Sequence, residues 1–205
     1  MTFGYSRMQK ETKLHIANLA SSILNPFLLA ILIVVMLALK STPTILSALR
    51  WSLALTVISI LPVMLVVIYL VRKGKLRGIF SSTRQQRTEL YLLAGVFTII
   101  DYITMILIKA PQMLIAGLVA AFFGLMLFMC INFRWKISLH TAFITGLVTL
   151  SVILYGWIAA IASVLVILVG WARTELKEHT LTQSITGALL AALVLTSTFY
   201  LFGFI

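Results

Sequence analysis

The chain has 205 residues, of which 61% are hydrophobic and 10% are charged, and its mean hydropathy is +1.12. Soluble domains have roughly 45–50% apolar and about 25% charged residues, so this composition excludes a soluble domain and indicates one integral membrane domain over residues 1–205. The net charge of +11 comes from basic residues in loops beside apolar spans, where they meet membrane lipids, so we expect no nucleic-acid partner.

Residues 1–18 are polar and basic, and they precede the first long apolar stretch. The spacing of Ile16, Leu19 and Ile23 is typical of an amphipathic helix that enters the membrane at its surface. We therefore interpret residues 1–18 as an N-terminal interfacial segment.

Apolar stretches then recur along the whole chain, and most approach the roughly 20 residues that a helix needs to cross a hydrocarbon core of ~30 Å. They predict an all-α fold, a polytopic membrane helix bundle with about seven transmembrane helices. Pro26 either kinks the first span or begins a shorter helix, and Pro62 predicts a kink within the second. The predicted spans cover residues 19–39, 51–71, 91–108, 113–131, 141–155, 157–172 and 184–204.

Asp101, the only aspartate of the chain, lies within the third predicted span. A carboxylate at that depth is costly and usually faces the interior of the protein or a cavity. It is either protonated or paired with a basic side chain, and structural pairing is at least as good an explanation as catalysis. In a small transporter the same residue would be the coupling carboxylate, but the chain shows no convincing internal repeat of the kind that transporters have.

Three hydrophilic clusters follow the second, fourth and sixth predicted spans, so an even number of crossings separates each pair and all three lie on one face of the membrane. Residues that can converge there include Arg84, Arg87, His140, Arg173 and His179. A general bias of basic loops toward one face would explain the arginines but not two histidines. The clusters are residues 72–90, 132–140 and 171–187.

The third cluster carries the clearest chemical pattern, an arginine and a histidine six residues apart at the mouth of a membrane helix. Arg173 offers a fixed charge and a fork of donors that suits phosphate oxygens, and His179 can carry a proton or act as a nucleophile near neutral pH. The plainer alternative is that these polar residues only form a loop between two membrane helices.

The order of these residues resembles the phosphatidic acid phosphatase type 2 superfamily of membrane lipid phosphatases, whose motifs are K-x6-R-P, P-S-G-H and S-R-x5-H-x3-D. Arg173 and His179 keep the R-x5-H spacing, and Ser138 and His140 stand where the serine and histidine of P-S-G-H would. Arg87 stands where the arginine of the first motif would. The resemblance covers about residues 70–190 and implies a six-helix phosphatase core, plus or minus one helix.

The resemblance implies a catalytic mechanism in which His179 attacks phosphorus and forms a phosphohistidine, while His140 protonates the leaving alcohol. It implies no metal and no other cofactor. At the position of the family's final aspartate this chain has Gln183, which can accept a hydrogen bond from the imidazole but brings no charge. Glu175, four residues before His179, could supply that charge instead.

The resemblance also implies which residues bind the phosphoryl group. Arg84, Arg87 and Arg173 would neutralise its oxygens, and Ser138 would contact it. The substrate would be a lipid phosphate or a prenyl (pyro)phosphate whose tail stays in the bilayer. The alternative within the same fold is a non-catalytic membrane protein that binds lipid phosphates.

Basic residues also predict the orientation of the chain in the membrane. The face with the N-terminus and the three clusters carries 13 of them, and the opposite face carries 3. The positive-inside rule then places the site and the N-terminus in the cytoplasm and the C-terminus outside, in the cell membrane.

Overall fold

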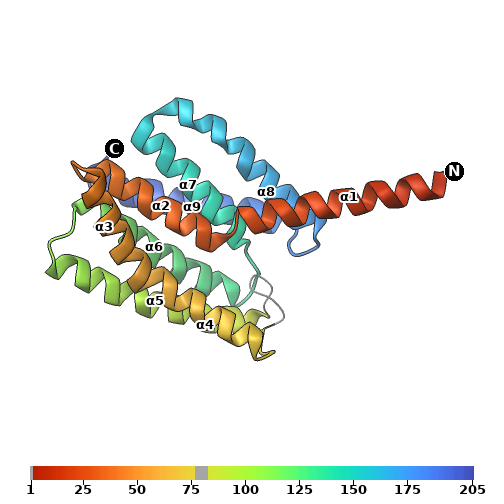
Figure 1. Cartoon of the computed structure of the whole chain (residues 1–205), viewed down its shortest axis with the longest axis horizontal. Coiled ribbons are helices and arrows are strands. Elements are labelled where there is room, and N and C mark those ends of the chain that lie inside the picture. Colours follow the sequence, from red (N-terminus) through yellow and green to blue (C-terminus); the bar gives the residue numbers. More distant parts are fainter. Residues whose placement is uncertain (1, 77–82) are drawn as a thin grey trace. The chain divides into compact units, whose positions relative to one another are not determined.

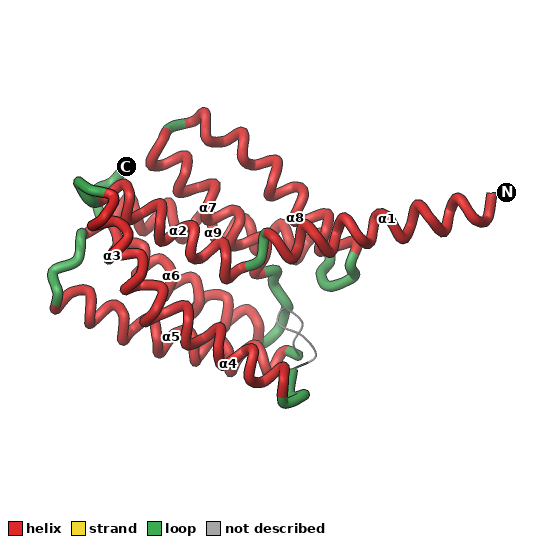
Figure 2. The backbone as a smooth tube through the Cα atoms, in the orientation of Figure 1, coloured by secondary structure: helices red, strands yellow, loops and turns green. Residues whose placement is uncertain are grey.

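The computed structural model describes residues 2–76 and 83–205; the side chains of residues 2–7 and 84 lie outside this description. All regular elements in these ranges are helical, which confirms the predicted all-α fold class (Figure 2). In chain order they are α1 (Thr2–Ile23), α2 (Pro26–Ser41), α3 (Ile45–Leu55), the π-helical turn η1 (Thr56–Ile60), α4 (Leu61–Arg72), α5 (Arg84–Leu107), α6 (Gln112–Asn132), α7 (Leu139–Tyr155), the 3-10 helix η2 (Trp157–Ala162), α8 (Ser163–Glu175) and α9 (Leu181–Leu201).

Five helical stretches in the described residues are long and apolar enough to cross a membrane, and a sixth is present if α1 and α2, bent by 42°, form one broken span. The chain is therefore an integral membrane protein with several spans. The predicted fifth span corresponds to α7, whose 17 residues make it shorter than these stretches. The five spans are Ile45–Arg72, Gln85–Leu107, Gln112–Asn132, Trp157–Glu175 and Leu181–Leu201.

The break between α1 and α2 settles the role of Pro26, which begins a shorter helix. The side-chain oxygen of Asn25 accepts a hydrogen bond from the backbone N–H of Leu28 at 3.0 Å, so Asn25 caps α2. Pro26 occupies the first helical position, where its missing N–H costs nothing.

The chain forms two compact units, and the boundaries between them fall inside α2, in the loop before α7, and inside α9. Unit 1 comprises Met1–Leu29 and Ile137–Ala192, and unit 2 comprises Ala30–Lys136 and Leu193–Ile205. His140, Arg173 and His179 therefore belong to unit 1, whereas Arg84 and Arg87 belong to unit 2.

Unit 1 is built on an antiparallel pair of helices, α7 followed by η2 and α8 (Figure 1). Gly156 makes the turn between them at φ 88°, a conformation that glycine adopts without strain. Leu29, Ile144 and Val169 are fully buried and form the core of the unit, and α1 packs along α8. Because the chain leaves and returns at the same end of this pair, the start of α7 and the end of α8 lie near each other.

Unit 2 contains a second antiparallel pair, α5 and α6, and α5 also packs against η1 and α4. Small residues allow close contacts here: a Cβ on Gly117 would come within 2.6 Å of the Leu37 side chain. Where the sequence predicts a kink at Pro62, the helix has a π-helical turn, η1, which ends at Ile60, two residues before this proline.

Candidate functional site

The end of α8 folds back on itself and positions the third polar cluster. Lys177 adopts φ 56°, and the N–H groups of Lys177 and Glu178 donate to the carbonyls of Thr174 at 3.0 Å and Arg173 at 3.1 Å. This pairing is a Schellman motif, with lysine in the left-handed position that glycine usually fills. The turn brings Glu178 back over Arg173 and sends His179 toward the start of α9.

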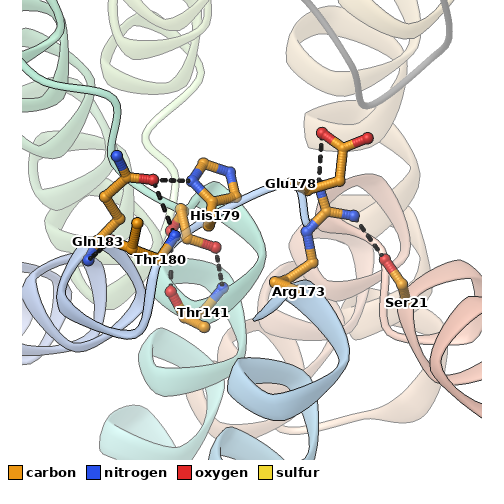
Figure 3. Close-up of polar contacts among 8 residues, drawn as sticks. Ser21, Thr141, Arg173, Glu178, His179, Thr180 and Gln183 are labelled. Carbon is orange, nitrogen blue, oxygen red and sulfur yellow. Dashed lines mark hydrogen bonds and ion pairs between the residues drawn. The ribbon is translucent and has the colours of Figure 1, made fainter. Parts of the chain in front are cut away.

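Arg173 is only 4% exposed, and its guanidinium contacts two side chains that the sequence did not suggest. Nη1 donates a hydrogen bond to the hydroxyl of Ser21 on α1 at 2.8 Å. Nη2 lies 3.6 Å from a carboxylate oxygen of Glu178, whose side chain is 29% exposed. Figure 3 shows the guanidinium directed to these two partners, so an internal carboxylate now occupies one side of the cation.

His179 is 5% exposed, and its ring Nδ1 lies 3.1 Å from the amide oxygen of Gln183 (Figure 3). An amide oxygen only accepts, so in this contact Nδ1 is the donor and carries a proton. The residue at the position of the family's aspartate therefore contacts the imidazole, as its i, i+4 spacing predicts. Glu175 is the last residue of α8.

Gln183 has a second structural role, because it also caps α9. Its side-chain oxygen accepts from the N–H of Thr180 at 3.2 Å, and its own N–H donates to the Thr180 hydroxyl at 3.3 Å. These reciprocal bonds are a capping box, in which glutamine and glutamate serve equally well. One oxygen thus fixes both the start of α9 and the orientation of the His179 ring.

The second polar cluster adjoins the third through the backbone. The N–H of Ser138 donates to the carbonyl of Gln183 at 3.3 Å. Ser138 is fully buried, and its hydroxyl caps α7 by accepting from the N–H of Thr141 at 3.4 Å. His140, 3% exposed, is the second residue of α7. The segments that carry the two histidines are therefore in direct contact in unit 1.

Arg84 and Arg87, the predicted phosphate-binding residues of the first cluster, begin α5 in unit 2. Thr83 and Gln86 form a capping box at this helix start, and the Arg87 side chain is buried at 5% exposure. The side chain of Arg84 lies outside the described residues. The convergence of these two arginines with the residues of unit 1 stays a prediction.

The contacts of Arg173 with Ser21 and with Glu178 could not be predicted from the sequence. Ser21 is 152 residues from Arg173 and lies in a stretch of small residues without any distinguishing pattern. Glu178 is close in sequence, but its approach to Arg173 depends on a left-handed turn at Lys177, where the usual glycine signal is missing.

Adjoining segments of unit 1 thus carry the Arg173–Glu178 pair and the two imidazoles, groups that can bind an anion and move a proton. Among the described residues there is no group of three or more histidine, cysteine or carboxylate side chains placed to hold a metal ion. Any anion bound at Arg173 would compete with Glu178 for the guanidinium.

Comparisons with known proteins add no family to this picture: no family model, no curated protein and no solved structure matches the chain. The resemblance to the phosphatidic acid phosphatase type 2 superfamily therefore depends on the motif residues themselves.

The contact between α9 and the start of α7 can be tested at Gly187. A Cβ there would lie 2.6 Å from the Ser138 carbonyl oxygen and 3.1 Å from the Thr141 hydroxyl. We expect Gly187→Ala to lower the free energy of unfolding in detergent by roughly 1–3 kcal/mol, because the overpacked backbone must move.

Gly124→Ala is the matched control, because no atom lies within 4 Å of the added Cβ in α6. We expect this variant to match or slightly exceed the stability of the original protein, because alanine favours helix over glycine by roughly 1 kcal/mol. Equal thermal unfolding of both variants would show that the two helices do not approach closely at Gly187.

Proposed function

We propose that the protein is a membrane-embedded phosphatase that hydrolyses a lipid phosphate or prenyl (pyro)phosphate through a phosphohistidine intermediate, without a metal. The single observation that carries the proposal is the 3.1 Å contact between His179 Nδ1 and the Gln183 oxygen, which orients the imidazole as a nucleophilic histidine requires. The buried Arg173 guanidinium in the same turn, and the adjoining segment with His140, support it.

In the proposed reaction, Nε2 of His179 attacks phosphorus and the bond from phosphorus to the lipid oxygen breaks. His140 donates a proton to that oxygen, so the lipid alcohol leaves as a neutral molecule. Water then attacks phosphorus and gives a proton to His140, the bond from phosphorus to Nε2 breaks, and inorganic phosphate leaves with both imidazoles restored. Gln183 keeps the ring oriented through both steps, and Ser138 contributes by fixing the start of α7 and thereby the position of His140.

Charge neutralisation would come from arginine, because phosphoryl transfer depends mainly on positioning and electrostatic stabilisation. Arg173 would bind phosphoryl oxygens with the face of its guanidinium that now meets Glu178. The 3.6 Å separation is longer than a hydrogen bond, and the carboxylate is partly exposed, so it can move into water when a phosphate enters. In the proposal, Arg84 and Arg87 supply further positive charge from unit 2.

A second candidate function is a non-catalytic protein that binds lipid phosphates. Two observations favour it: the group that orients His179 carries no charge, and Arg173 already has a carboxylate partner. In the serine-protease triad the comparable change from carboxylate to amide costs about 10⁴ in rate. The two functions differ in whether a phosphoryl group is ever transferred to His179.

The chemistry of the intermediate provides the test of the phosphatase function. Purified protein in lipid vesicles that contain ³²P-labelled phosphatidate or prenyl pyrophosphate should release phosphate and, after an alkaline quench, retain an acid-labile, base-stable label. We expect His179→Ala to abolish both signals, and His140→Ala to slow release.

The third histidine of the chain, His15, is the matched control, because it is exposed on α1. His15→Ala should release and trap phosphate as the original protein does. Vesicle binding without release or trapped label, and with His179→Ala behaving like the original protein, would replace the phosphatase with the binding protein.

Gln183→Glu should raise the hydrolysis rate. Glutamate keeps the length of glutamine and the capping box with Thr180, and it places a negative charge against Nδ1 of His179 as the imidazole becomes positive. We expect a gain of at least about tenfold in kcat, by analogy with the ~10⁴ effect of the comparable triad carboxylate.

Thr182→Glu adds the same charge to the same turn of α9 from an exposed position next to Gln183. This control should leave kcat within about twofold of the original value, since it lies outside the i, i+4 contact with His179. Equal acceleration by both variants would show that charge on this turn, and not orientation of the imidazole, controls the rate.

The proposal includes the orientation in which the site faces the cytoplasm, supported by the excess of basic residues on that side. Cysteine labelling tests it in a Cys130→Ala background, because Cys130 is the one native cysteine. A membrane-impermeant maleimide should label Lys109→Cys in intact cells and Lys73→Cys only after permeabilisation; both positions are exposed. The reverse pattern would place the site outside.

A further inference from the structure

Asp101 is a second buried polar centre, and the proposed phosphatase reaction does not use it. It lies on α5 six residues before the end of this span and is 0% exposed. The Ser59 hydroxyl donates a hydrogen bond to Oδ2 of the carboxyl group. The other oxygen, Oδ1, is buried and has no hydrogen-bond partner among the described residues.

The partner of Asp101 sits at a break in its own helix. Ser59 belongs to η1, in which the N–H of Leu61 donates to the carbonyl of Thr56, five residues back. Pro62 follows and has no N–H, which is why the regular ladder is interrupted here. Ser59 is fourteen residues from the start of the Ile45–Arg72 span and thirteen from its end, so this break lies at mid-span. Single π-helical turns of this kind are frequent at functional sites.

No cation that could neutralise Asp101 faces it from the described parts of the packed helices. On α5 itself the nearest charged residue, Glu89, is twelve residues away, about 18 Å along the helix axis. Lys109, eight residues after Asp101 in the loop beyond α5, is exposed. On α4, Tyr69 and Arg72 are ten or more residues beyond Ser59, about 15 Å or further, and η1 has no titratable side chain. Of the remaining titratable residues on α5 and α6, Tyr102 and Cys130 are exposed, and Arg84, Arg87 and Tyr91 come ten or more residues before Asp101 in the chain.

A buried carboxylate in a membrane span needs a cation, several donors or a proton, because its charge is otherwise desolvated without compensation. One neutral hydroxyl meets only part of that need. A hard cation is a poor alternative, since Mg²⁺ and Ca²⁺ take about six or more oxygen ligands, whereas the described contacts bring a single side-chain oxygen to this carboxyl group.

We propose that Asp101 is a proton-binding site of unit 2, at which the carboxyl group holds a proton on Oδ1 near neutral pH while Ser59 holds Oδ2 at the π-helical break. The ligand is the proton itself. This proposal about Asp101 does not depend on the proposed phosphatase reaction.

Infrared spectroscopy tests this proposal directly, because the chain has only five carboxylic side chains. Purified full-length protein in lipid vesicles at pH 7 should show the C=O stretching band of a protonated carboxyl group, shifted in D₂O. Asp101→Asn should remove the band. Glu89→Gln, a substitution at an exposed carboxyl group on the same helix, should leave it unchanged.

Ser59→Ala gives a second measurement that does not depend on replacing Asp101. Loss of its hydrogen bond should move the band to higher frequency while the band itself persists. Absence of the band at pH 7 in the original protein would overturn the proposal, because Asp101 would then be ionised. Disappearance of the band on adding NaCl at constant pH would also overturn it, in favour of a cation site.

Discussion

The arrangement of unit 1 depends on the buried guanidinium of Arg173. A charge at 4% exposure is tolerated only when it is paired and hydrogen-bonded. Its partners come from two other places in the chain, Ser21 on α1 and Glu178 in the turn after α8. The contacts of Arg173 with Ser21 and Glu178 therefore hold α1 against α8 and stabilise the turn that carries His179.

Much of the fold could be predicted from the sequence because membrane helices are governed by a few strong rules. Length and apolarity located the spans, and the two possible roles of Pro26 included the one that the structure has. The packing of α1 along α8 could not be predicted, because residues 1–18 read as an interfacial segment with an exposed polar face. The π-helical form of the break at Pro62 also depends on packing that composition does not encode.

The candidate site divides in the same way between local and distant contacts. The i, i+4 spacing of His179 and Gln183 predicts their contact, since helical geometry alone brings such residues together. The ion pair of Arg173 with Glu178 depends on a left-handed lysine, and its bond to Ser21 depends on tertiary packing. Sequence patterns thus identified the chemistry of His179 but not the partners that hold its neighbouring cation.

Arg173 and Asp101 are both buried and meet the same physical constraint in different ways. Arginine cannot lose its proton at any pH at which proteins function, so Arg173 must be matched by a carboxylate and a hydroxyl oxygen. An aspartate becomes neutral when it binds a proton, so Asp101 can be buried against a single hydroxyl. The difference explains why Arg173 has a carboxylate beside it that an anionic ligand must displace. Asp101, by contrast, lies at a break in a helix where the ligand can be as small as a proton.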